Sequence, residues 1–177
     1  YLVKDIAVGP SSASAGSLTA FEGLLYFTAN NGTQGSELWQ SDGTNAGTVL
    51  VKDVASGLTS SSPNNLTVVG ATLFFTAFDS ANGTELWKTD GTAVGTVLVT
   101  NIAASTGSSA PANLRDVGGT LFFTANDGVN GIELWKSNGT AAGTVMVKNI
   151  VSGSGSSSPA NLTVAGGSLF FTMTDAT

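Results

Sequence analysis

A 48-residue repeat constrains the fold of this chain more than any other feature. The three tryptophans recur at this spacing, at Trp39, Trp87 and Trp135. The chain divides into three full units and a truncated copy, at residues 1–48, 49–96, 97–144 and 145–177. The whole length lies within the usual range for one domain. We therefore treat residues 1–177 as a single repeat domain.

Each unit is predicted to contain four strands. In the second unit, short segments rich in Val, Phe, Leu and Thr alternate with clusters of Gly, Asn, Asp and Ser, a pattern typical of strands. The predicted strands are Leu66–Val69, Thr72–Ala77, Glu85–Lys88 and Thr96–Ile102. Gly70-Ala71 fits a two-residue hairpin turn between the first two strands. The Ser-rich segment Ser56–Pro63 is expected to cross from one unit to the next.

The second and fourth strands of a unit are apolar on successive residues, as in Leu73-Phe74-Phe75. Both faces of such a strand must be covered, because a half-exposed sheet would alternate apolar and polar residues. Small antiparallel sheets covered on both sides by similar neighbours are typical of β-propeller blades. The sequence thus predicts an all-β, β-propeller-type array of four-stranded blades, in preference to a β-solenoid or a sandwich. Trp87 and Phe75 are expected to be buried between adjacent blades.

The predicted strands of the whole chain number 15. The chain is expected to open with a fourth strand at Leu2–Ile6 and to end with a first and second strand at Leu162–Val164 and Leu169–Met173. The third strand of the truncated copy is missing, and the second and fourth strands of a meander run in the same direction. Because those two strands cannot pair directly, we expect the chain to be a segment of a longer repeat array and not a closed ring.

A recurring motif in each full unit resembles the bacterial ELWxxDGT repeat family. The motif stands at Glu37–Thr44, Glu85–Thr92 and Glu133–Thr140, and the third copy carries Asn138 where the family has Asp. The resemblance implies a β-propeller-like protein of repetitive architecture, secreted or located at the bacterial cell surface, without an assigned activity. An extracellular or cell-surface location is therefore expected.

Composition excludes several functions. The chain has no Cys and no His, so disulfides, Cys/His zinc sites and His-based catalytic pairs are absent. The net charge of −6 disfavours nucleic acid, because binding to a phosphate backbone needs clustered Lys and Arg. A membrane span requires about 18 consecutive apolar residues, and no apolar run in the chain is that long. No membrane insertion is therefore expected.

The candidate binding residues lie in the turn between the second and third strands and at the start of the motif. They are Asp79, Asn82, Glu85, Asp127, Asn130 and Glu133. Such oxygen-rich turns can hold calcium, although the spacing is not that of an EF-hand. The alternative interpretation is turn chemistry, in which Asx side chains bond to the nearby backbone. No other cofactor is indicated, and calcium stays open.

The sequence favours a structural role over an enzymatic one. Single-copy acids such as Glu22 and Asp116 lie beside predicted hairpins, where polar residues are expected for solubility alone. The recurring tryptophans suit a repeated core better than sugar-stacking platforms. We therefore expect a non-catalytic extracellular module that acts as a structural or adhesive scaffold, with a protein partner or self-association. A carbohydrate-binding lectin with one site per blade is the alternative, in which case the partner is a glycan.

Overall fold

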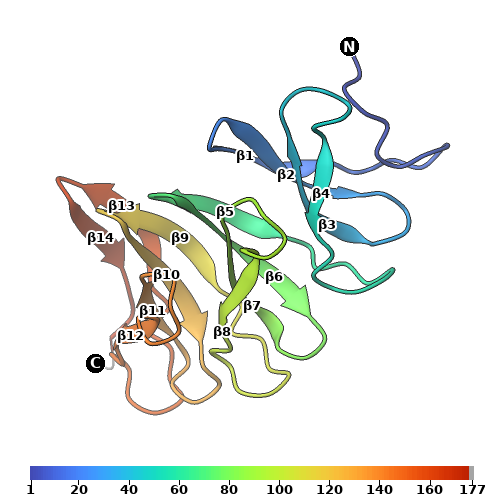
Figure 1. Cartoon of the computed structure of the whole chain (residues 1–177). Helices are drawn as coiled ribbons and strands as arrows, with labels where there is room; N and C mark the ends of the chain where they lie inside the picture. Colours follow the sequence, from blue (N-terminus) through green and yellow to red (C-terminus); the bar gives the residue numbers. More distant parts are fainter. Residues whose placement is uncertain (176–177) are drawn as a thin grey trace.

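A computed structural model of the chain describes residues 1–175 and shows an all-β protein (Figure 1). The described residues contain 14 strands and no helix. Three sheets have four strands each, and the last two strands form a separate hairpin.

The first sheet contains β1 (Gly16–Phe21), β2 (Leu24–Asn30), β3 (Ser36–Ser41) and β4 (Val49–Lys52). The second contains β5 (Asn64–Val69), β6 (Thr72–Asp79), β7 (Gly83–Thr89) and β8 (Val97–Thr100). The third contains β9 (Ala112–Val117), β10 (Thr120–Asn126), β11 (Ile132–Ser137) and β12 (Val145–Lys148), and the hairpin is β13 (Ala160–Ala165) with β14 (Ser168–Thr172).

Each sheet is an antiparallel meander, because every strand pairs with the strand next to it in the sequence. In the second sheet Phe75 on β6 lies opposite Trp87 on β7, and in the third sheet Phe123 on β10 lies opposite Trp135 on β11. The four strands predicted for the second unit are confirmed, with bounds that agree within two residues. The 48-residue repeat thus gives one four-stranded sheet per period, and the fourth strand of each sheet lies at the start of the next unit, as β8 does.

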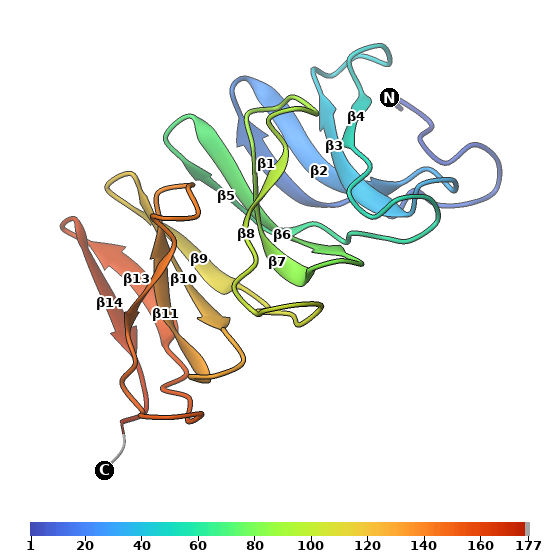
Figure 2. The ribbon, with the colours of Figure 1, turned by 60° about the horizontal axis from the view of Figure 1, so that its bottom comes forward.

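The sheets lie side by side in chain order, each with a face toward the next (Figure 2). Their first strands are also neighbours, since β5 contacts both β1 and β9, and β9 contacts β13. One edge of every sheet is therefore drawn toward the same side of the molecule.

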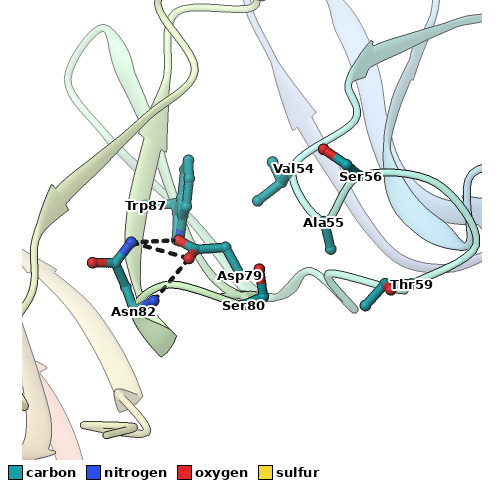
Figure 3. Close-up of a pocket in the computed structure, with 8 residues that line it drawn as sticks. All are labelled: Val54, Ala55, Ser56, Thr59, Asp79, Ser80, Asn82 and Trp87. Atoms are coloured by element: carbon teal, nitrogen blue, oxygen red, sulfur yellow. Dashed lines mark hydrogen bonds between the residues drawn. The ribbon is translucent and has the colours of Figure 1, made fainter. Parts of the chain in front are cut away.

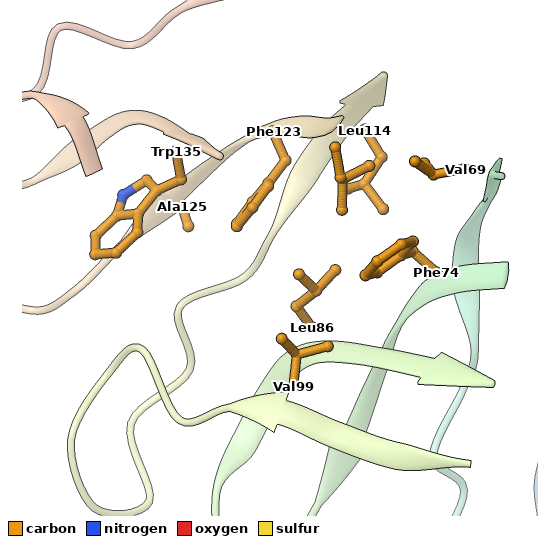
Figure 4. Close-up of a cluster of buried hydrophobic side chains, with 9 residues drawn as sticks. Val69, Phe74, Leu86, Val99, Leu114, Phe123, Ala125 and Trp135 are labelled. Carbon is orange, nitrogen blue, oxygen red and sulfur yellow. The ribbon is translucent and has the colours of Figure 1, made fainter. Parts of the chain in front are cut away.

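The hydrophobic core lies between the sheets. One cluster joins Phe74 and Leu86 of the second sheet to Phe123 and Trp135 of the third (Figure 4). A second cluster joins residues of the first sheet to Phe75 and Trp87 of the second. Phe75 is fully buried and Trp87 is 8% exposed, which confirms the burial expected of both residues. Each sheet thus buries its face only because a neighbour covers it.

The segments that connect the sheets form hydrogen bonds with both of them. Between the first and second sheets, the Ser62 N–H donates to the Ser36 carbonyl of β3, and the Phe78 N–H of β6 donates to the Ser61 carbonyl. The distances are 3.0 and 2.8 Å. The Ser-rich connection is therefore a fixed part of the interface between sheets.

The Asp-Gly-Thr part of the motif closes the turn between the third and fourth strands. The carboxylate of Asp90 accepts bonds from the N–H and hydroxyl of Thr92, at 2.9 and 2.7 Å. Asn138 accepts the same two bonds from Thr140, at 3.0 and 2.7 Å. A single side-chain oxygen satisfies the turn, so Asn138 does not disrupt it.

The strand predicted at Leu2–Ile6 is absent, and the described residues hold 14 strands instead of 15. A strand needs a paired neighbour, and no third strand of the same sheet lies beside this segment. The segment instead packs against the first sheet. Ile6 contacts the cluster of Phe27 and Trp39, and the Lys4 ammonium donates to the Thr48 carbonyl at 2.7 Å.

Candidate functional site

The turn between β6 and β7 contains the first pair of predicted site residues. Asp79 Oδ1 accepts bonds from the N–H groups of Ala81 and Asn82, both at 2.8 Å. The Asn82 side-chain amide donates to both carboxylate oxygens of Asp79, at 3.0 and 2.9 Å. The two residues do come together, and the polar atoms are engaged in turn chemistry.

The turn between β10 and β11 repeats this arrangement. Asp127 Oδ1 accepts from the N–H groups of Val129 and Asn130, and the Asn130 amide donates to Asp127 Oδ2 at 2.7 Å. Burial raises the pKa of Asp127, but these hydrogen bonds to Asn130 and Val129 outweigh it and hold the pKa below its ordinary value. The carboxylate is thus stabilised in its charged form by its own turn.

A third polar side chain joins each of these pairs and was missed by the sequence analysis. It is the residue that directly follows the fourth strand of the sheet. Asn101 donates from Nδ2 to Asn82 Oδ1 at 3.0 Å, and Asn149 donates to Asn130 Oδ1 at 2.7 Å. The Oδ1 atoms of Asn101 and Asn149 are buried without a donor. The recurrence of these residues every 48 positions could have revealed them.

The first sheet builds the same cluster with its carboxylate in a different place. Asn31 and Gln34 bond to each other through their side-chain amides at 2.7 Å, and Gln34 Nε2 donates to Asp53 Oδ2 at 3.5 Å. Asp53 occupies the position of Asn101 in the second sheet. Each cluster therefore contains one carboxylate and two amides, although the turn of the first unit has no acid.

The predicted site residues Glu85 and Glu133 do not join these clusters. Both side chains are fully buried, as is that of Glu37. Glu85 accepts bonds from the N–H groups of Ile102, Ala103 and Ser109 at 3.2, 3.3 and 2.9 Å, and from the Ser109 hydroxyl at 2.5 Å. The carboxylate is thus surrounded by donors of the connection to the third sheet.

Glu37 and Glu133 make the equivalent bonds. The Ser61 hydroxyl donates to Glu37, and the Ser157 hydroxyl donates to Glu133, both at 2.5 Å. Burial raises the pKa of Glu37 and Glu85 above the ordinary value, and the bonds from the serines offset only part of this effect. We call each Glu with its Ser, Glu37–Ser61, Glu85–Ser109 and Glu133–Ser157, a Glu–Ser latch.

A pocket of about 310 Å³ lies between the connection that follows β4 and the turn between β6 and β7 (Figure 3). Asp79, Asn82 and Trp87 line it on one side, and Val54 and Thr59 on the other. Because only 8% of Trp87 is exposed, its ring offers no open face for a sugar to stack on. The pocket brings polar atoms together without an aromatic platform.

The two single-copy acids considered in the sequence analysis both lie at hairpins. Glu22 lies in the hairpin turn of the first sheet with a φ of 50°, and Asp116 in the third sheet accepts a bond from the Gly119 N–H at 2.8 Å. These two acids belong to different sheets. Within residues 1–175, no group of three or more His, Cys, Asp or Glu side chains could hold a metal ion. Calcium binding stays a prediction.

Comparisons of the chain with protein-family models, curated proteins and solved structures found no match. Among the described residues, no helix is long and apolar enough to cross a membrane.

Proposed function

We propose that this chain is a non-catalytic module of propeller type that acts outside the cell as a structural or adhesive scaffold. The observation that carries the proposal is the use of the recurring polar residues. The buried glutamates bind the connections between sheets, and the Asp-Gly-Thr segments close turns. The repeated motif therefore serves the architecture, which supports a structural role. The extracellular location rests on the resemblance to the ELWxxDGT repeat.

The arrangement of the sheets supports the propeller part of the proposal. Consecutive sheets pack face to face through the two large hydrophobic clusters. Their first strands, β1, β5, β9 and β13, are neighbours, as the inner strands of propeller blades would be.

The exposed faces of the first sheet and of the β13–β14 hairpin support association with a second copy of the chain. Phe170 on β14 is 60% exposed, whereas Tyr26 and Phe74 at the equivalent positions are buried against the next sheet. Leu18 on β1 is 64% exposed, whereas Leu114 at its equivalent position is buried against the preceding sheet. The outer face of the hairpin thus carries one half of the interface that the chain builds internally. The outer face of the first sheet carries the other half only in part, because the N-terminal segment already buries Phe27 and Trp39. Their association would be head-to-tail.

Sedimentation velocity over a range of concentrations tests this scaffold. We expect association that grows with concentration and that weakens in the variants Leu18→Ser and Phe170→Ser. The matched controls are Val94→Ser and Val129→Ser, because these valines are exposed but lie in turns away from the sheet faces. A protein that stays monomeric at every concentration, or that associates equally well in all four variants, would contradict the proposal.

A further inference from the structure

Two equivalent pockets lie at one edge of the second and third sheets. The first has a volume of about 430 Å³ and lies where β5 begins and β6 ends. The second has a volume of about 380 Å³ and lies where β9 begins and β10 ends. All ten residues that line the first pocket have a counterpart 48 residues later in the second. The repeat therefore builds the same cavity twice, at a place that the sequence analysis did not single out.

Both pockets have an uncharged polar side. Asn65 lies in the first and Asn113 in the second, each with its backbone at a positive φ, 54° and 56°. Each side-chain amide donates to a threonine hydroxyl at 3.3 Å, Thr76 and Thr124 respectively. Both asparagines are exposed, and neither Oδ1 accepts a bond from the described residues. Each pocket thus presents an amide oxygen that can accept a hydrogen bond from a ligand.

Both pockets also have an apolar side, which they obtain from different residues. The first contains Phe78 at the end of β6 together with Pro111, and the second contains Ile132 at the start of β11 together with Pro159. In the second pocket Asn126 stands at the position of Phe78. The large apolar side chain of that pocket, Ile132, therefore comes from a different position of the repeat. Neither Phe78 nor Ile132 belongs to the buried clusters between the sheets. The apolar surface is therefore available in the pocket.

From these features we infer that the two pockets bind two residues of one neutral oligosaccharide chain. A sugar ring combines hydroxyl groups with an apolar C–H face, and each pocket pairs hydrogen-bonding groups with one large apolar side chain and a proline. No charged side chain lines either pocket, and the net charge of −6 disfavours an anionic polymer. This activity goes beyond the proposed scaffold and uses other residues than those expected for a lectin.

The test uses the variants Asn65→Gly and Asn113→Gly, alone and together. Glycine adopts a positive φ without strain, so these changes remove the amide and keep the backbone. The matched control is Ser17→Gly, because Ser17 has the equivalent position and a φ of 51° but lines neither pocket. Titration calorimetry would use neutral hexasaccharides and disaccharides of glucose, mannose and galactose, with alginate as the anionic comparison. It would be run at concentrations where the chain does not self-associate.

We expect at least one neutral hexasaccharide to bind more tightly than its disaccharide, because it engages both pockets. Each single variant should weaken hexasaccharide binding about fivefold, as the loss of one hydrogen bond does. The double variant lacks both amides, so it should bind the hexasaccharide no more tightly than a single weak site would. Ser17→Gly should leave the hexasaccharide affinity unchanged. Saturable binding that the double variant does not alter would overturn the inference. So would alginate binding more tightly than every neutral sugar, or no binding of any neutral hexasaccharide.

Discussion

The Glu–Ser latch between the second and third sheets allows a quantitative prediction. Glu85→Ala removes the acceptor for three backbone N–H groups and one hydroxyl at a fully buried position. A buried donor without an acceptor costs about 1–3 kcal/mol, and some of these donors will find water once the side chain is gone. We therefore expect Glu85→Ala to lower the free energy of unfolding by about 3–5 kcal/mol.

Two smaller changes separate the parts of this latch. Ser109→Ala removes only the hydroxyl bond to the carboxylate and should cost about 1.5–3 kcal/mol, the range for hydrogen bonds to charged groups. Glu85→Gln keeps one acceptor oxygen but places an amide opposite the Ile102 N–H, which should cost about 1–3 kcal/mol. Ala13 occupies the position of this serine in the first unit, so alanine itself fits the backbone there.

Urea denaturation and amide hydrogen exchange would measure these effects. Exchange should accelerate at the Ser109 and Ala103 amides, because they lose their acceptor. The acceleration there should exceed that of the amides in the strands. Glu22→Ala is the matched control, because that glutamate is exposed in a hairpin turn. The reasoning would be refuted if Glu85→Ala destabilised the protein no more than Glu22→Ala, or if the two amides kept their protection.

Three further changes test other parts of the repeat. Trp87→Ala should cost about 3–5 kcal/mol in urea denaturation, as large-to-small core changes do, whereas Val94→Ala at an exposed turn should change little. Gly95→Ala should lower the melting temperature by opening the turn, because an added Cβ would clash with the Asp90 carboxylate; an unchanged melting temperature would contradict this. The hydrogen bonds from Thr92 hold the pKa of Asp90 below its ordinary 3.8, so its contribution to stability is present above that pH and is lost as the pH falls through the lowered value. Asp90→Asn should therefore reduce the loss of stability in acid and keep the turn, as Asn138 does in the third unit, and an unaltered acid profile of melting temperature would argue against it.

Local pattern was enough to predict the sheets. Runs such as Leu73-Phe74-Phe75, separated by Gly-rich turns, are properties of neighbouring residues, and they predicted the strands of the second unit within two residues. The segment Leu2–Ile6 has the same local pattern, yet it forms no strand because its pairing partner is not beside it. Strand formation there depends on a contact that local sequence does not contain.

The buried glutamates show the limit of the site prediction. Glu85 was predicted to be a binding residue because it follows an oxygen-rich turn of a kind that can hold calcium, yet the structure buries it fully. Its partner Ser109 lies 24 residues later, and the same separation links Glu37 with Ser61. The paired recurrence was visible in the sequence, but only the structure shows that the connection folds back over the carboxylate.

The two edge pockets were hidden from the sequence for a different reason. Each is assembled from two connections and three strands, and their large apolar residues, Phe78 and Ile132, do not occupy equivalent positions. A comparison of units favours the positions that stay the same, and in this chain those positions, such as Glu85 and Trp87, maintain the interface between sheets. Packing of the sheets does not account for Phe78 or Ile132, because neither lies in the buried clusters. Two pockets that keep one large apolar side chain through different residues are better explained by what they bind than by what they support.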